Sequence, residues 1–78
     1  MKIKELIEKL KEFDQELMVV ISGYEGGVNE VDSTEEIDIV LNVHDVSYYG
    51  NHQEVDSDYR KAQYPESKYK YEQAVFIT

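Results

Sequence analysis

The chain has no cysteine, one proline and four glycines among its 78 residues. Without cysteine it can build neither a disulfide framework nor a zinc site made of thiolates. No apolar run approaches the roughly twenty residues of a membrane-spanning helix, and the N-terminus lacks the pattern of a signal peptide. We therefore expect a cytoplasmic protein, and the length predicts a single domain, residues 1–78.

Basic residues are missing from the middle of the chain, because no Lys or Arg lies between Lys11 and Arg60. The charge is −13 over residues 12–59 and +4 over the two ends, for a net charge of −9. Such a block attracts cationic surfaces and repels nucleic acid and anionic lipid. The middle carboxylates are Glu12, Asp14, Glu16, Glu25, Glu30, Asp32, Glu35, Glu36, Asp38, Asp45, Glu54, Asp56 and Asp58.

Apolar residues at helical spacing predict a helix from about Ile3 to Phe13. Its polar face mixes Lys and Glu, which favours packing in a core over docking on a membrane or a partner.

Three later segments predict strands. Residues 17–22 are apolar at both parities, which is typical of a central strand. Residues 37–43 alternate, with the odd positions expected inward, and residues 68–77 form the last predicted strand. Residues 24–33 are expected to turn between the first two strands.

This order predicts an α+β fold in which the N-terminal helix packs on one face of a small three-stranded antiparallel sheet (α-β-β-β). A long, tyrosine-rich, acidic connection precedes the last strand. Met18, Val20, Val40 and Phe76 are expected on the second face, covered either by residues 46–64 or by a second subunit in a homodimer. The connection could be a long hairpin link, or Asp56 could cap a short helix that runs to about Gln63 and ends before Pro65.

Residue patterns for chemistry are weak. His44, Asp45, His52, Asp56 and Asp58 match no known metal spacing, and Arg60 stands where a calcium loop needs an oxygen ligand. The glycines of residues 23–27 surround a glutamate that would repel phosphate. The exposed carboxylates lack the burial that separates pKa values in acid–base pairs. We therefore expect no enzyme, no metal and no cofactor.

The acidic surface is the strongest functional feature. It could occupy a Lys/Arg groove that normally follows a phosphate backbone, with tyrosines as contact anchors, or it could serve solubility alone. The predicted partner-binding residues are Glu30, Asp32, Glu35, Glu36, Asp38, Asp45, Tyr48, Tyr49, Asp56, Asp58 and Tyr59.

A resemblance is carried by Lys4-Glu5-Leu6-Ile7, Leu10, Phe13-Asp14, residues 17–21 and Gly26-Gly27. With these residues, the first half of the chain resembles the opening of small acidic proteins common in phages and prophages. In size, charge and order of elements the chain is also similar to phage anti-defence proteins of the anti-CRISPR kind, which stand in for nucleic acid.

The resemblance implies a non-enzymatic protein in the host cytoplasm that covers a basic nucleic-acid-binding site of a host defence protein. It would contact neither nucleic acid nor membrane directly. Two alternatives remain open. One is an oligomer that sequesters a small molecule in an intersubunit pocket lined by Tyr48, Tyr49 and Tyr59, and the other is a structural or housekeeping phage module without a host target.

Overall fold

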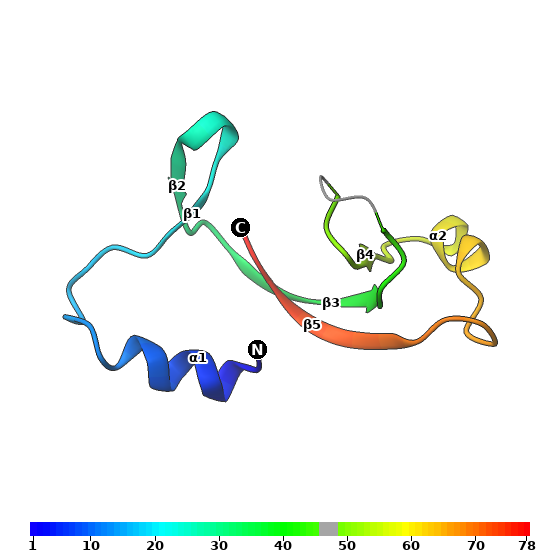
Figure 1. The fold of residues 1–78 in the computed structure, drawn as a ribbon, viewed down its shortest axis with the longest axis horizontal. Coiled ribbons are helices and arrows are strands. Elements are labelled where there is room, and N and C mark those ends of the chain that lie inside the picture. The colour runs from blue at the N-terminus through cyan, green and yellow to red at the C-terminus, as the bar shows by residue number, and fades with distance from the viewer. Residues whose placement is uncertain (46–48) are drawn as a thin grey trace. The chain divides into compact units, whose positions relative to one another are not determined.

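The computed structural model describes residues 1–45 and 49–78 (Figure 1). The chain divides into two compact units, which we call the N-terminal unit (Met1–Val31) and the C-terminal unit (Asp32–Thr78). The predicted α+β class, with an N-terminal helix and a small antiparallel sheet of three strands, is confirmed. The prediction of one domain stays a prediction.

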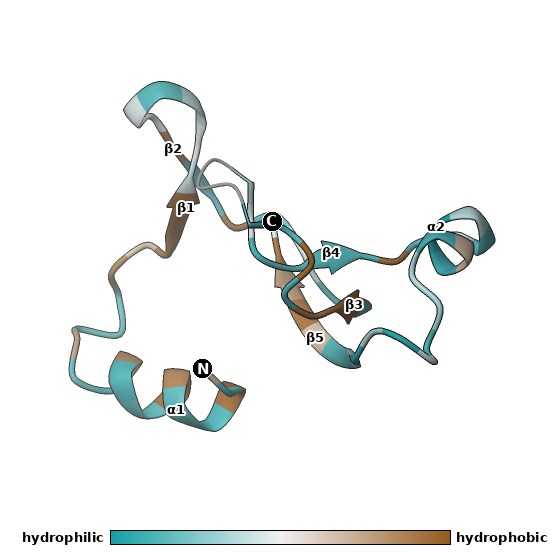
Figure 2. Cartoon of the chain, turned by 45° about the vertical axis from the view of Figure 1, so that its right-hand side comes forward, coloured by the Kyte–Doolittle hydropathy of each residue, from teal (hydrophilic) through white to brown (hydrophobic). Residues whose placement is uncertain are grey.

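Helix α1 (Ile3–Leu10) opens the N-terminal unit and ends three residues before the predicted Phe13. The chain leaves the helix through Phe13 and Asp14, whose carboxylate accepts a hydrogen bond from the Glu16 N–H at 3.0 Å. This local bond offers the backbone an alternative to a further helical turn. Brown, apolar positions recur along α1 in Figure 2, and Ile7 and Leu10 are 49% and 42% exposed.

A two-stranded hairpin completes the N-terminal unit. Strand β1 (Val20–Ser22) pairs antiparallel with β2 (Val28–Glu30), and the one-turn helix η1 (Tyr24–Gly26) joins them. The prediction of a central strand over residues 17–22 is therefore wrong in length and in place, and the segment predicted as a turn holds a strand. The Gly23 N–H donates to Gly27 O at 2.7 Å, and a Cβ at Gly23 would lie 2.9 Å from that oxygen, so this close approach requires glycine.

The C-terminal unit holds a three-stranded antiparallel sheet in the order β4-β3-β5. Its strands are β3 (Thr34–Val40), β4 (Gln53–Glu54) and β5 (Tyr71–Ile77). Strand β3 begins and ends three residues before the predicted 37–43, and β5 begins three residues after Lys68. The third strand of the sheet is β4, a pair of polar residues in the connection, rather than residues 17–22.

Helix α2 (Asp58–Gln63) lies in the connection and ends at the predicted residue. Its N-cap is Ser57, one residue beyond the predicted Asp56: the Ser57 hydroxyl accepts a hydrogen bond from the Arg60 N–H at 3.3 Å. Serine is as good a cap as aspartate, so the sequence alone could not separate the two positions.

Two side chains form the buried core of the described residues: Val40, fully buried, and Val55, 7% exposed. Both belong to the C-terminal unit. The Val55 N–H donates to Asp38 O at 2.9 Å, which places Val55 opposite Asp38 and on the face that Val40 shares. The prediction that odd positions of the second strand point inward is thus wrong at Val40.

The expectation that Val40 and Phe76 share a face is also wrong. Val40 pairs with Tyr71 and Phe76 pairs with Glu35, five positions along β3, so the two side chains lie on opposite faces of the sheet.

Candidate acidic binding surface

Strand β3 distributes its carboxylates over both faces of the sheet. Glu36 and Asp38 lie opposite Val75 and Gln73 on the Val40 face, whereas Glu35 lies opposite Phe76 on the other face. Residues two apart on a strand are about 6.8 Å apart, so Glu36 and Asp38 form a closely spaced pair. All three carboxylates are exposed. The sheet therefore brings together two of the three predicted β3 carboxylates and separates the third.

The connection from β4 to α2 carries two more exposed carboxylates, Asp56 and Asp58. It begins beside β3, because the Val55 N–H donates to Asp38 O. Asp56 is exposed in this connection, and Asp58 is the first residue of α2, where a negative charge interacts favourably with the helix dipole. Tyr59 follows on α2 with 71% of its side chain exposed.

Two acidic residues, Glu66 and Asp38, act on the hydroxyl of Tyr71. Partial burial of the ring, then the negative charges of Glu66 and of Asp38, raise the pKa of the Tyr71 hydroxyl above its usual value. The hydroxyl donates a hydrogen bond to Tyr64 O at 2.5 Å, which fixes its position. Both carboxylates therefore act on one fixed point at the end of the sheet near α2.

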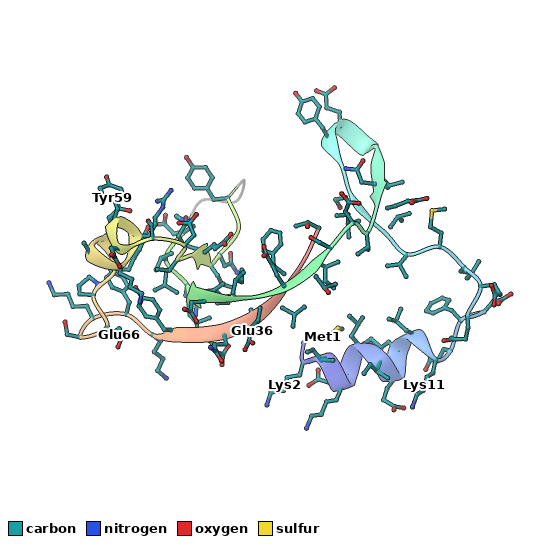
Figure 3. All side chains as sticks on the ribbon, turned by 180° about the vertical axis from the view of Figure 1, so that it is seen from behind. Met1, Lys2, Lys11, Glu36, Tyr59 and Glu66 are labelled. Carbon is teal, nitrogen blue, oxygen red and sulfur yellow. The ribbon has the colours of Figure 1, made fainter. Side chains whose placement is uncertain are left out.

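Glu66 was not among the predicted residues. It lies in the turn after α2, and Figure 3 shows it below Tyr59 at the α2 end of the unit. The Lys68 and Tyr69 N–H groups both donate to Pro65 O and so form this turn. Pro65 cannot continue the helix, and it is the residue from which the turn could have been predicted. We call Asp38, Asp56, Asp58 and Glu66, with Tyr59, the acidic surface.

The other predicted residues lie elsewhere. Glu30 is in β2 of the N-terminal unit, and Asp32 is held at the sheet end by its N–H bond to Thr78 O. Asp45 is exposed after β3, and Tyr49 stacks edge-on against His44 with ring centroids 5.3 Å apart. Tyr48 lies outside the described residues.

Within the described residues, no Lys or Arg forms an ion pair with the acidic surface. Across residues 1–45 and 49–78, the one ion pair joins Lys11 to Glu8 at 2.9 Å, on exposed α1. The C-terminal unit holds ten carboxylates against four Lys or Arg, for a charge of −6 by count. Its field is therefore available to a partner.

The histidines have structural partners. His52 Nδ1 accepts a hydrogen bond from the Asn42 N–H at 2.9 Å, and His44 Nε2 lies 2.9 Å from Gln53 Oε1. Among the described residues, no three His, Asp or Glu side chains gather in a way that could hold a metal ion. An open hollow on α1 is lined only by Lys4, Glu5, Glu8 and Lys9, and it includes no predicted site residue.

No helix in the described part of the chain is both long and apolar enough to cross a membrane. Comparison with protein-family models, with curated proteins and with solved structures found no match for the chain.

Proposed function

We propose that the chain is a non-enzymatic binding protein whose acidic surface covers a cationic, nucleic-acid-binding site on another protein. The observation that supports this function is that Asp38 and Glu66 both act on the Tyr71 hydroxyl, while no cation is paired to these two or to the exposed Asp56 and Asp58 in the described residues. Unpaired exposed carboxylates lower stability through mutual repulsion, and a cationic partner reverses that cost.

A protein groove that binds a phosphate backbone bears Lys and Arg at close intervals. Several carboxylates of one small unit can therefore each contact a cation of the groove in the same complex. Each contact displaces counterions, which makes the affinity depend on salt. Tyr59, which follows Asp58 on α2 and is 71% exposed, supplies an amphipathic aromatic ring that can act as a contact anchor. Charge then governs the rate of association, and the aromatic contact slows dissociation.

The narrower proposal is that the partner is a host defence protein, of the kind that phage anti-CRISPR proteins block. It follows from the resemblance of the first half of the chain to phage proteins and from its size and charge. Neither the intersubunit pocket nor the structural phage module is favoured by a specific observation, and Tyr49 and Tyr59 belong to different segments of the C-terminal unit.

The test compares two double variants with the same change of net charge. Asp38→Lys/Glu66→Lys reverses the acidic surface, and Glu12→Lys/Glu16→Lys reverses two exposed residues of the N-terminal unit. The tagged proteins are used to capture partners from bacterial lysate at low and at high salt, and a captured protein must release the chain when oligonucleotide is added.

We expect the first variant to lose at least tenfold in affinity for that protein and the second to lose much less, because only the first removes direct contacts. Equal losses would show that net charge alone acts. Capture that neither salt nor oligonucleotide reverses would refute the proposal.

A further inference from the structure

Strand β5 is the edge strand of the sheet in the C-terminal unit. It pairs with β3 along all seven residues, and no described strand lies on its other side. An extended edge of this length is a ready template for another strand, unless the protein protects it.

The hydrogen bonds show which backbone groups of β5 are free to pair. Ser33 and Thr78 exchange both of their N–H···O bonds, at 2.8 and 3.0 Å, and the Leu41 N–H donates to Lys70 O at 2.9 Å. In an antiparallel ladder such pairs alternate, so Glu72, Ala74 and Phe76 direct their backbone groups toward β3. The N–H and C=O groups that point away from β3 belong to Tyr71, Gln73, Val75 and Ile77.

The outer edge of β5 has little of the usual protection, since Glu72 is the single charged residue of the strand. Between Tyr71 and Ile77 there is no proline and no lysine, and the register with β3 runs without a bulge. These are the devices by which natural edge strands avoid pairing with one another. Val75, Phe76 and Ile77 are 44%, 38% and 40% exposed, so the edge also presents apolar side chains.

We propose that a second copy of this chain binds there, with the two β5 strands antiparallel about a two-fold axis at Ala74. In this register Tyr71 lies opposite Ile77 of the second copy, and Gln73 lies opposite Val75. Both pairs use outward-pointing groups, so the alternation permits about eight backbone hydrogen bonds. Glu72 lies opposite Phe76, and no like charges face each other.

The ends of the paired strands carry no like charges opposite each other, because Lys70 of one copy lies opposite Thr78 of the other. The two-fold axis repeats every one of these pairs, which a partner of different sequence would not do. Repulsion between the remaining charges is screened beyond about 8 Å at physiological salt.

Paired in this way, the two units form one six-stranded sheet in the order β4-β3-β5-β5-β3-β4. Because side chains of directly opposite residues share a face, Glu36 and Asp38 of both copies lie on the same side. The pairing does not depend on the proposed function, since it uses the strand edge and not the acidic surface.

The test uses charge swaps at two outward positions. Gln73→Lys/Val75→Lys places Lys opposite Lys twice, and Gln73→Glu/Val75→Glu places Glu opposite Glu twice. Like charges directly opposite are destabilising, so each variant should dissociate at a concentration at least tenfold higher than the native chain. An equimolar mixture of the two should restore dimers, because every Lys then faces a Glu. Analytical ultracentrifugation with circular dichroism measures mass and folding together.

Amide hydrogen exchange gives the second measurement. The Gln73 and Val75 N–H groups should be protected at concentrations where the native chain is dimeric and unprotected after dilution. A native chain that is monomeric at millimolar concentration would overturn the proposal. So would dimers that persist in both variants, a mixture that stays monomeric, or protection that dilution does not remove, which would mean that the chain covers its own edge.

Discussion

Truncation of Val40 is the sharpest perturbation of the fold. Val40 is fully buried and, with Val55, is one of two buried side chains in the described residues. Val40→Ala removes two methyl groups. At about 0.8 kcal/mol for each buried carbon the transfer loss is roughly 1.6 kcal/mol, and the cavity left behind raises the cost to about 2 to 3 kcal/mol.

The matched control is Val75→Ala. Val75 is on the same sheet, is also β-branched and is 44% exposed, so it loses about half of the transfer term and leaves no cavity. Its cost should be about 0.5 to 1 kcal/mol. A chain of this length has a free energy of unfolding of roughly 4 to 12 kcal/mol, so the Val40 change alone should remove a large share of it.

Urea unfolding is followed by circular dichroism at a protein concentration of about a few micromolar. The shift of the urea midpoint gives the loss of unfolding free energy in each variant. The reasoning is refuted if the two variants are destabilised equally. That result would mean that Val75 is as well covered as Val40, and that the C-terminal unit has a core beyond the two valines.

Three further predictions concern single contacts. Tyr71→Phe removes the hydroxyl that bonds to Tyr64 O. Because the pKa of this hydroxyl is raised in the folded state, it stabilises the native chain below about pH 10, and that stability is lost as the pH rises through the folded-state pKa. The urea midpoint of the native chain should therefore fall more steeply at alkaline pH than that of the variant. Ser57→Ala removes the cap bond from the Arg60 N–H and should cost about 1 kcal/mol in urea unfolding, whereas Ser57→Asp should cost almost nothing. Asn42 has a φ of 54°, so Asn42→Ala should lower the thermal midpoint by the equivalent of about 1 kcal/mol while Asn42→Gly leaves it nearly unchanged; equal effects would mean that strain is unimportant there.

The elements that were predictable are those in which apolar residues recur at a regular spacing in the sequence. Helix α1 follows from apolar residues at helical spacing, and β3 and β5 follow from alternation, each within about three residues of the observed ends. The end of α2 was predictable because Pro65 restricts the residue before it. The beginning was not, because Asp56 and Ser57 are both competent caps and only the backbone geometry selects one.

The misplaced strand has a different cause. Residues 17–22 are apolar at both parities, which indicates burial, but their partner β2 holds only one apolar residue, Val28, and β4 holds none. Strands this short and polar are selected by pairing with a neighbour, which no local pattern encodes. Strand alternation does indicate that Glu35 and Glu36 face apart, but no local pattern shows that Glu66 and Asp38 would both act on the Tyr71 hydroxyl.

The ladder between β3 and β5 also determines where charge appears on the molecule. Side chains alternate strictly along β3, so deletion of Ile37 would move Glu36 into the position of the lost residue while Val40 kept its place. Glu36 and Glu35 would then each lie on the face that the other occupies in the parent. Such a variant would differ from the parent by one apolar residue and would have the same net charge. A binding partner that reads one side of the sheet would nevertheless meet a rearranged pattern of carboxylates.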